Sequence, residues 1–278
     1  MKNINKNQLV VFILILVFFV PTVFLSLPEK NQSSIYFLDV GQGDSEFINI
    51  SGVDILIDGG PVGGGVMHEL SKAMSPFDRY IDLIIMTHPQ ADHFGGLIDV
   101  FKRYKVGAFM YNGEKGDSSA LKDLEKAISD NGSKIIKLQA GDRIKYKNSV
   151  FTVLSPNKKI NDLNEASLVL KLQTNGTQTL FTGDIGEKIE ELIKNKVGDI
   201  HILKVAHHGS KYSSSASFLN AVDPEVSVIE VGGNSYGHPH NEVINKLRKI
   251  NSRVYRTDLD GTVKIKISSG TLNIFTSS

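Results

Sequence analysis

The stretch that decides the fold is residues 83–96, LIIMTHPQADHFGG, in which a run of large apolar residues is followed by His88, Asp92 and His93. Residues 83–87 predict a buried strand and residues 95–104 predict a helix, so the polar side chains follow the end of a strand. Imidazole and carboxylate groups packed this closely would leave polar groups unpaired in a dry interior. A metal ion binds neutral imidazole nitrogen and anionic oxygen together, so the pattern predicts a metal site.

Two further predicted strands end in the same kinds of group. The sequence TGD at residues 182–184 closes one strand, and HHGS at residues 207–210 closes the next. Asp184 alone is also a suitable N-cap for the following helix, with Glu187 completing a capping box. The His pair on the next strand favours the metal-site interpretation, because ligand sites gather at the C-terminal ends of parallel strands.

The order of predicted elements indicates the fold class. Strand-like runs at residues 35–40, 46–50 and 53–57 form a meander, and the chain then alternates between strands and helices. This pattern, which occurs twice, predicts an α+β fold, an αββα sandwich with two mixed sheets packed face to face and helices outside. No internal linker follows, so residues 34–278 are expected to form one domain. The other predicted helices are residues 66–74, 119–131, 187–195, 214–221 and 242–250, and the other strands are residues 134–138, 150–154, 168–173, 179–182, 200–205, 226–231, 262–267 and 271–275.

The N-terminal segment predicts a membrane location. Residues 9–27 carry no charge, and as a helix of about 1.5 Å per residue they would span roughly 28 Å. Lys2 and Lys6 precede this segment, so the positive-inside rule places the N-terminus in the cytoplasm and the rest of the chain outside. We expect residues 1–33 to be a single uncleaved transmembrane anchor in the cell membrane, with a polar linker at residues 28–34. The alternative is a cleaved signal peptide and secretion, although no A-x-A-like cleavage site follows the apolar stretch.

The composition limits both the metal ligands and the substrate. The chain has no Cys, which excludes disulfides and thiolate-bound zinc and leaves His, carboxylate and amide oxygen as ligands. The net charge is +1 for the whole chain, and residues 34–278 carry 28 basic and 29 acidic residues. This balance gives no bulk argument for nucleic-acid binding, so any contact with DNA must rest on a local basic patch.

In their order along the chain, these motifs resemble the metallo-β-lactamase superfamily of metallohydrolases. The closer resemblance is to the hydrolase-like domain of the ComEC competence proteins, which take part in DNA uptake. It covers residues 35–267 and lacks the multi-pass membrane part of a full competence protein. Besides the motifs above, it rests on FLDVGQGDS at 37–45, IDGG at 57–60, SLVL at 167–170, KVAHHGS at 204–210, GHP at 237–239, RTD at 256–258 and DG at 260–261.

The resemblance implies a set of metal ligands. Gln90 stands where superfamily members generally have a second His, and residues 164–167, NEAS, contain no His where another is usual. One half-site, Asp92, His93, Asp184 and His207, is thus complete. The other has His88, the shared Asp184 and the amide oxygen of Gln90. More oxygen and less nitrogen shift the preference from zinc towards manganese, so we expect one or two divalent ions, Zn²⁺ or Mn²⁺. The implied ligands are His88, Asp92, His93, Asp184 and His207, with Asp184 bridging two ions.

Three residues are predicted to take part in catalysis. Asp92, as ligand or nearby base, would orient the attacking water. His208 has two interpretations, either stabilising an anionic oxygen or supporting a ligand. The resemblance implies that His238 faces the site and contacts substrate phosphate. His240 has two interpretations, either facing the site as well or being an exposed turn residue.

Acidic residues beside glycines have plainer interpretations. Asp39 and Asp44 flank a glycine turn and are expected to be structural. Asp58 precedes Gly59 and Gly60, and it either braces a ligand His or caps a turn.

The predicted function is that of a membrane-anchored, outward-facing, metal-dependent hydrolase of phosphodiesters, with DNA as the substrate that the ComEC resemblance suggests. One alternative is a hydrolase of small or cell-surface phosphodiesters. Another is a catalytically degenerate metal-binding module, which Gln90 favours and the intact His88 and Asp92 oppose. β-Lactam hydrolysis is not implied, because a fold does not fix a substrate. The sequence indicates no protein partner.

Overall fold

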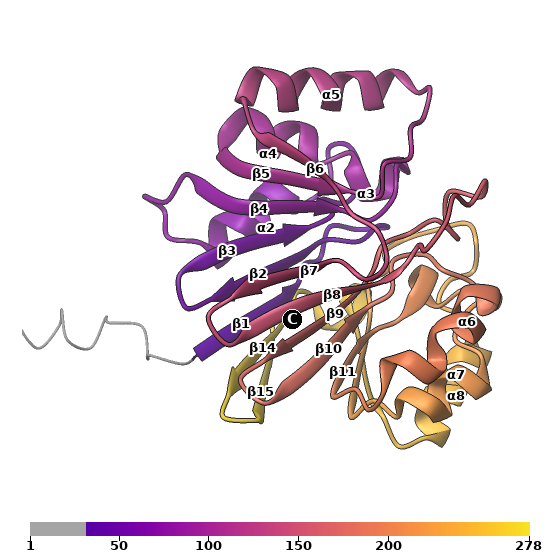
Figure 1. Ribbon diagram of the computed structural model, residues 1–278. Helices are drawn as coiled ribbons and strands as arrows, with labels where there is room; N and C mark the ends of the chain where they lie inside the picture. The colour runs from indigo at the N-terminus through magenta and orange to yellow at the C-terminus, as the bar shows by residue number, and fades with distance from the viewer. Residues whose placement is uncertain (1–31) are drawn as a thin grey trace, which may run out of the picture.

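The computed structural model describes residues 32–278 as two mixed sheets that pack face to face with helices on both outer faces (Figure 1). Neighbouring strands from β15 to β3 are antiparallel and those from β3 to β6 are parallel. The eight strands of the first sheet follow the order β15 (Thr271–Thr276), β14 (Val263–Ser268), β1 (Gln32–Phe37), β2 (Glu46–Ile50), β3 (Val53–Ile57), β4 (Tyr80–Met86), β5 (Lys105–Tyr111) and β6 (Lys134–Lys137).

The second sheet repeats this division between parallel and antiparallel strands. Strands β13 to β10 are parallel neighbours and β10 to β7 are antiparallel neighbours. The seven strands follow the order β13 (Arg253–Arg256), β12 (Val226–Ile229), β11 (Ile202–Lys204), β10 (Thr177–Phe181), β9 (Val169–Thr174), β8 (Ser149–Ser155) and β7 (Arg143–Tyr146). The predicted pair of mixed sheets with helices is therefore present.

Helices cover the outer face of each sheet, and three apolar clusters fill the spaces between layers. In β4, Ile84 packs towards the helices and Ile85 packs between the sheets, as the two-residue period of a strand requires. Helices α2, α4 and α5 cover the first sheet and α6, α7 and α8 cover the second. The helical segments are α2 (Val66–Ala73), α3 (Ala91–Phe94), α4 (Leu97–Arg103), α5 (Ser119–Asn131), α6 (Glu187–Val197), the 3-10 turn η1 (Ala206–Gly209), α7 (Ala216–Val222), α8 (Asn241–Lys249) and α9 (Thr257–Asp260).

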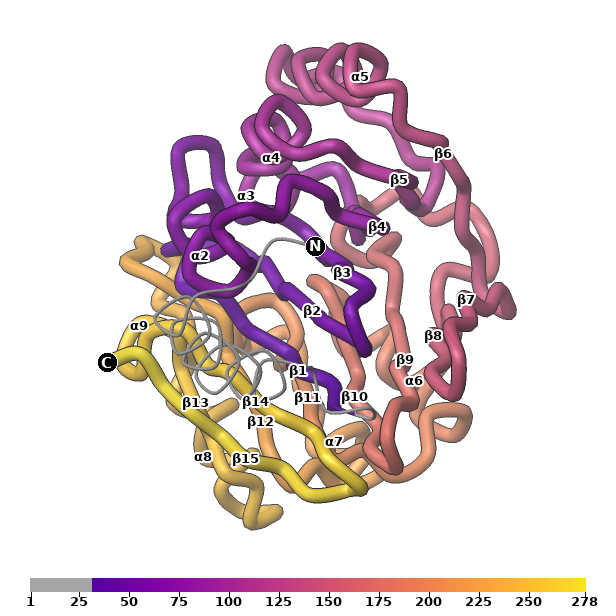
Figure 2. The backbone as a smooth tube through the Cα atoms, turned by 90° about the vertical axis from the view of Figure 1, so that its left-hand side faces the viewer, coloured from indigo at the N-terminus to yellow at the C-terminus, as the bar shows by residue number. Residues whose placement is uncertain are grey.

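The first described strand extends further than the sequence predicts. Figure 2 shows the C-terminal hairpin of β14 and β15 beside β1, and Gln32 pairs with Ser268 at the start of that ladder. Ser33 is buried, and its hydroxyl lies 3.0 Å from that of Thr174. Residues 32–34, expected to belong to a polar linker, are thus strand residues, because pairing with β14 compensates for their weak strand preference.

Three strands were not predicted from the sequence, namely β5, β7 and β13. In β5 only Val106 and Phe109 are buried, so its residues show no clear alternation, yet it pairs with β4 on one side and β6 on the other. Strands β7 and β13 are four-residue edge strands, each with two charged residues and no fully buried residue. Pairing with neighbours, rather than local pattern, determines all three.

The predicted transmembrane segment, residues 9–27, lies outside the described residues. Within residues 32–278, no helix combines the length and the apolar character needed to cross a bilayer.

Candidate metal centre

The candidate centre lies where the C-terminal ends of parallel strands from both sheets meet. From the first sheet, β4 leads into His88 and the short helix α3, which carries Asp92 and His93. From the second sheet, β10 leads to Asp184 and β11 leads to the turn η1. The predicted clustering of these side chains is therefore observed, because each strand delivers its next residues to the same edge.

Four side chains converge closely enough to hold one cation. Ligand atoms of Asp92, His93, Asp184 and His208 all lie within 4.8 Å of one another. The Nε2 atoms of His93 and His208 lie 3.3 and 3.5 Å from Oδ2 of Asp184, and Nε2 of His208 lies 3.6 Å from Oδ2 of Asp92. Two imidazoles and two carboxylates at this spacing form a typical ligand set for a divalent transition metal.

Several of these atoms are buried without a hydrogen-bond partner among the described residues. They are the Nε2 atoms of His88, His93 and His208 and the Oδ1 atom of Asp184. Buried polar atoms are normally paired, since an unpaired one costs about 1–3 kcal/mol. The rings of His88 and His93 are also only 4.1 Å apart, so both imidazoles face the same small space. A bound cation would satisfy all four atoms, so the donor set fits a metal.

Asp58 holds His93 in a ligand orientation. One oxygen of Asp58 lies 2.8 Å from Nδ1 of His93, and its carboxylate also accepts hydrogen bonds from the backbone N–H and hydroxyl of Thr87. The proton on His93 is therefore fixed at Nδ1, which leaves the lone pair of Nε2 directed towards the cation space. Of the two interpretations of Asp58, bracing a ligand His is the one that matches the structure.

His88 is arranged as a neutral ligand. Its Nδ1 lies 3.0 Å from the hydroxyl of Thr87 and 3.1 Å from that of Ser167, while Nε2 has no partner in the described part of the chain. Burial, together with the neighbouring His93, lowers the pKa of His88 to about 3. The imidazole is thus unprotonated at neutral pH, which is the form that binds metal.

The opposed charges at the centre shift the pKa values of its other groups. Burial favours the neutral form of Asp184, but His208 and His93 outweigh it and hold its pKa well below the usual range. Burial likewise opposes protonation of His93 and His208, but Asp184 and Asp44 hold the pKa of each imidazole well above its usual value. The carboxylates thus create a strongly negative site that attracts positive charge, either protons or a metal ion.

His208 is the residue whose role changes most between sequence and structure. Its Nδ1–H donates to the backbone carbonyl of Glu230 at 2.9 Å, which leaves Nε2 free to face Asp184. The backbone turns sharply here, because His207 and His208 both adopt left-handed φ values of 52°. Such strained conformations persist where a site requires them, and here they direct the two rings differently. The structure therefore adds His208 to the candidate ligands.

Gln90, Asn164 and His207 lie on the more open side of the centre. The side-chain amide of Gln90 donates to Oδ1 of Asn164, whose Nδ2 lies 3.5 Å from Nε2 of His207. That nitrogen of His207 is 3.8 Å from Oδ2 of Asp184, and the side chain is 27% exposed. His207 was predicted to complete the half-site of Asp92, His93 and Asp184, but His208 converges on those residues instead. His207 lies beside Gln90, and Asn164 links the two candidate ligands of a second ion.

The predicted loop histidine also lies at the centre. The ring of His238 is 5.6 Å from that of His207 and 6.4 Å from that of His208, and its Nδ1 is buried without a partner among the described residues. Burial and the neighbouring His207 lower the pKa of His238 to about 4. Its ring lies 5.4 Å from that of His240, which is half-buried and thus fits the site-facing interpretation better than the exposed one.

A buried charged cluster beneath the centre was missed by the sequence analysis. Asp44 contacts the ammonium of Lys204, and its oxygens lie 3.2 Å from Nδ1 of His208 and 3.6 Å from Nδ1 of His93. Lys204 lowers the pKa of Asp44 to about 2 although burial acts in the opposite direction. Asp44 thus has a structural role that extends beyond the glycine turn, because tertiary packing places it against two candidate ligands. The sequence signal that could have revealed this buried cluster is a lysine directly after the apolar pair Ile202 and Leu203.

Two buried glutamates complete this cluster. Glu46 on β2 and Glu230 after β12 lie close to Asp44, and Glu230 accepts the backbone N–H of Ser45 at 3.0 Å. Burial and the charge of Asp44 raise the pKa of Glu230 to about 8, and burial with the charge of Glu230 raises that of Glu46 well above its usual value. At least one of these carboxyl groups is thus protonated at neutral pH.

Comparisons with known proteins agree with this architecture. The family described as the metallo-beta-lactamase superfamily matches residues 38–232. The chain is 30% identical over 271 residues to ComE operon protein 3 of Bacillus subtilis (strain 168), and 31% identical over 253 residues to competence protein ComA of Neisseria gonorrhoeae. Both alignments cover 88% of this chain but only 35% and 34% of the relatives, so the chain spans about a third of their length. The predicted resemblance to competence proteins is confirmed.

Solved structures share the fold at low sequence identity. The metallo-beta-lactamase fold protein YhfI from Bacillus subtilis aligns with a TM-score of 0.58 and 12% identity, covering 88% of this chain and 100% of that protein. A diphosphatase from the PhnP family aligns with a TM-score of 0.51 and 14% identity, covering 85% and 98%. These matches show a common fold.

Proposed function

Because the chain belongs to the metallo-beta-lactamase superfamily, we propose that it is a metal-dependent hydrolase whose substrates are phosphodiesters. The observation that carries this proposal is the convergence of buried, unpartnered imidazole nitrogens on Asp184. Asp92, His93, Asp184 and His208 would hold one ion, and His88, Gln90, Asp184 and His207 would hold a second. When bound, Zn²⁺ or Mn²⁺ supplies Lewis acidity that polarises a phosphoryl oxygen and lowers the pKa of water to about 7.

Residues of the chain itself would orient the attacking water and contact the substrate. Asp92 is the most exposed of the four convergent side chains, at 33%, and His208 holds its pKa below the usual value despite burial. It is therefore ionised at neutral pH and accessible to water, as a group that orients a nucleophile must be. His238 is uncharged at neutral pH and would contact a substrate phosphate by donating a hydrogen bond rather than through charge.

Phosphodiesters are favoured by the relatives as well as by the chemistry of the site. ComE operon protein 3 and competence protein ComA are relatives named for competence, which suggests a nucleic acid as the substrate. A centre of hard and borderline ligands is suited to polarising anionic phosphoryl oxygens. The alternatives are a hydrolase of small or cell-surface phosphodiesters and a metal-binding module without turnover. Gln90 favours the latter, because an amide oxygen is a weaker ligand for a transition metal than the imidazole that superfamily members generally have there.

Metal analysis and hydrolysis assays on the full chain test the proposal. We expect bound metal, and hydrolysis of both bis(p-nitrophenyl) phosphate and single-stranded DNA with Mn²⁺ or Zn²⁺. Turnover of the small diester alone would favour the first alternative, and bound metal without turnover of either ester would favour the binding module. His68→Ala is a suitable control, because the side chain of His68 is 70% exposed and lies outside the centre.

The proposal includes an anchored, outward-facing location for the domain. It is supported by the apolar residues 9–27, by Lys2 and Lys6 before them, and by the relatedness to competence proteins. A C-terminal phosphatase reporter that matures only outside the cytoplasm should be active in membrane fractions. Activity of a reporter that works only in the cytoplasm would contradict this location, and recovery of the domain from the medium would favour cleavage and secretion.

A further inference from the structure

A groove lined by lysines lies beside the metal centre, between the loops that follow β5, β6 and β8. Its volume is about 440 Å³. Four of its lining residues are exposed lysines, and the others include amides and a single acidic residue, Glu114. We call this feature the lysine groove, after Lys115, Lys137, Lys158 and Lys159.

Strand register places the lysine groove on the same edge as the centre. Met86, two residues before His88, pairs with Tyr111 of β5, and Tyr111 pairs in turn with Lys137 of β6. Since neighbouring strands lie about 4.8 Å apart, the backbone of Lys137 is roughly 10 Å from that of Met86. Figure 1 shows the ends of β4 and β5 on the side of the molecule where α3 lies.

Hydrogen bonds connect the walls of the lysine groove to the centre. The side chain of Asn112 donates to the backbone carbonyl of Ala166 at 2.9 Å, which joins the loop after β5 to the loop after β8. The next residue, Ser167, contacts Nδ1 of His88 at 3.1 Å. The groove and the centre thus share one continuous framework.

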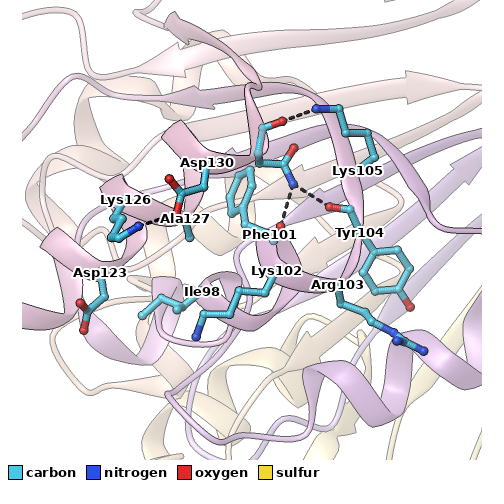
Figure 3. A pocket seen from close by; sticks show the side chains of 11 residues that line it. Ile98, Phe101, Lys102, Arg103, Tyr104, Lys105, Asp123, Lys126, Ala127 and Asp130 are labelled. Atoms are coloured by element: carbon cyan, nitrogen blue, oxygen red, sulfur yellow. Dashed lines mark hydrogen bonds and ion pairs between the residues drawn. The ribbon is translucent and has the colours of Figure 1, made fainter.

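The charges of the lysine groove are not neutralised by the protein. Within residues 32–278, none of its four lysines forms an ion pair. A larger groove of about 690 Å³ provides the contrast, between α4 and α5 (Figure 3). There Lys126 pairs with Asp130 at 2.6 Å, and the Lys105 ammonium donates to the backbone carbonyl of Asn131. That groove begins at Lys105, the first residue of β5, so it lies at the opposite edge of the sheet.

We propose that the lysine groove holds the backbone of a single-stranded nucleic acid whose neighbouring phosphate occupies the metal centre. This inference rests on the proposed function. Among residues 32–278, no aromatic side chain lines the groove, so it contacts phosphates rather than stacked bases, and binding is independent of base sequence. His88 and His93 are fully buried, so the reacting phosphate must enter a recess. A flexible single strand can bend into it, whereas a stiff duplex resists such bending.

The salt dependence of binding tests this inference directly. Binding of a labelled oligothymidylate with cleavage-resistant phosphorothioate linkages is measured on the full chain with its metal present. Four phosphate contacts predict a slope of log affinity against log salt of about −2.8, or roughly 50-fold weaker binding between 50 and 200 mM salt. The triple variant K137Q/K158Q/K159Q should make the slope less negative by about two. Binding would then weaken only roughly threefold between 50 and 200 mM salt.

A matched variant controls for total charge. K102Q/R103Q/K126Q removes three charges from the groove at the opposite edge and should leave the slope unchanged. Three results would overturn the inference: an equal change of the slope in both variants, an unchanged slope in K137Q/K158Q/K159Q, or tighter binding of duplex than of single strand. Hydrolysis of bis(p-nitrophenyl) phosphate by K137Q/K158Q/K159Q should match that of the unaltered chain, because a small diester does not reach the lysines.

The two proposals fail in different ways. If the unaltered chain hydrolyses no diester, the proposed function is wrong, while the binding slopes still decide whether the lysine groove holds a strand. If hydrolysis is normal and the lysine substitutions do not alter binding, the lysine groove is wrong and the proposed function stands.

Discussion

The two sides of the metal centre differ in how firmly the fold holds their ligands. On one side, His93 is braced by Asp58, and Nδ1 of His208 donates to the carbonyl of Glu230. On the other side, Gln90 is held only by the Asn164 amide, and His207 is partly exposed. Ligand side chains that are already held by hydrogen bonds lose little conformational freedom when they bind an ion. The first side should therefore bind an ion more tightly than the second. We therefore expect unequal occupancy of the two sides.

Replacement of the shared ligand should have the largest effect. Asp184→Asn removes the charge on which both sides converge, while an amide of the same shape preserves packing. Metal binding and hydrolysis should each fall by more than about 100-fold, beyond the loss expected for a residue that only supports a ligand. Metal content and kcat/KM for bis(p-nitrophenyl) phosphate check this. Retention of one tightly bound ion would show that the two sides do not share Asp184.

The next largest effect should come from the residue that braces His93. Asp58→Asn weakens the interaction that fixes the proton at Nδ1, so metal affinity should fall by about 10–100-fold. Asp54→Asn is a matched control on β3, the strand that ends just before Asp58, because Asp54 is also buried but pairs with Asn49. Chelator competition measures both variants. Equal losses of metal affinity in both variants would mean that the effect comes from disturbing β3 rather than from losing the interaction between Asp58 and His93.

The weaker side can be strengthened by an added imidazole. Gln90→His replaces an amide with a nitrogen donor that zinc prefers, so zinc stoichiometry should rise towards about two ions per chain. Gln173→His places the same group on an exposed part of β9 and should not change the stoichiometry. Unchanged zinc content in Gln90→His would show that this side lacks the geometry for an ion, whatever its ligands.

The layers of the fold were predictable because strands and helices have different apolar periods. The buried run ending at Met86 and the amphipathic helix α5 were both recognisable in the sequence. Strand β5 was not recognisable, because pairing with β4 and β6 stabilises it and its own residues alternate poorly. Pairing is a property of the sheet, so no local pattern could reveal it.

The candidate site was predictable where ligands are close in the sequence. His88, Asp92 and His93 lie within one turn-rich segment and were identified together. The distinction between His207 and His208 depends on left-handed backbone angles that no residue type at these positions indicates. The pair of Asp44 and Lys204 joins segments that are far apart in the sequence, so only the fold brings them together.

The smallest expected effect is on the free energy of unfolding, through Glu230 in the buried charged cluster beneath His93 and His208. Glu230 has a pKa of about 8 in the folded chain, above its ordinary value of 4.5. Below pH 4.5 it is protonated in both states, and between pH 4.5 and 8 only the unfolded chain loses the proton. The free energy of unfolding therefore decreases as pH rises through this window, by up to a few kcal/mol.

Glu230→Gln should remove most of that decrease, because glutamine does not titrate and still accepts the N–H of Ser45. Urea unfolding of the full chain at pH 5 and pH 8 measures the difference. The variant should resemble the unaltered chain at pH 5 and be more stable at pH 8, while His208 keeps its bond to the backbone carbonyl of residue 230 and metal affinity changes little. A variant that loses equal stability at both pH values would show that Glu230 is ionised in the folded chain. Lys204 would then face two ionised carboxylates, Asp44 and Glu230, while the bracing of His93 by Asp58 and of His208 by the backbone carbonyl of residue 230 would be unaffected.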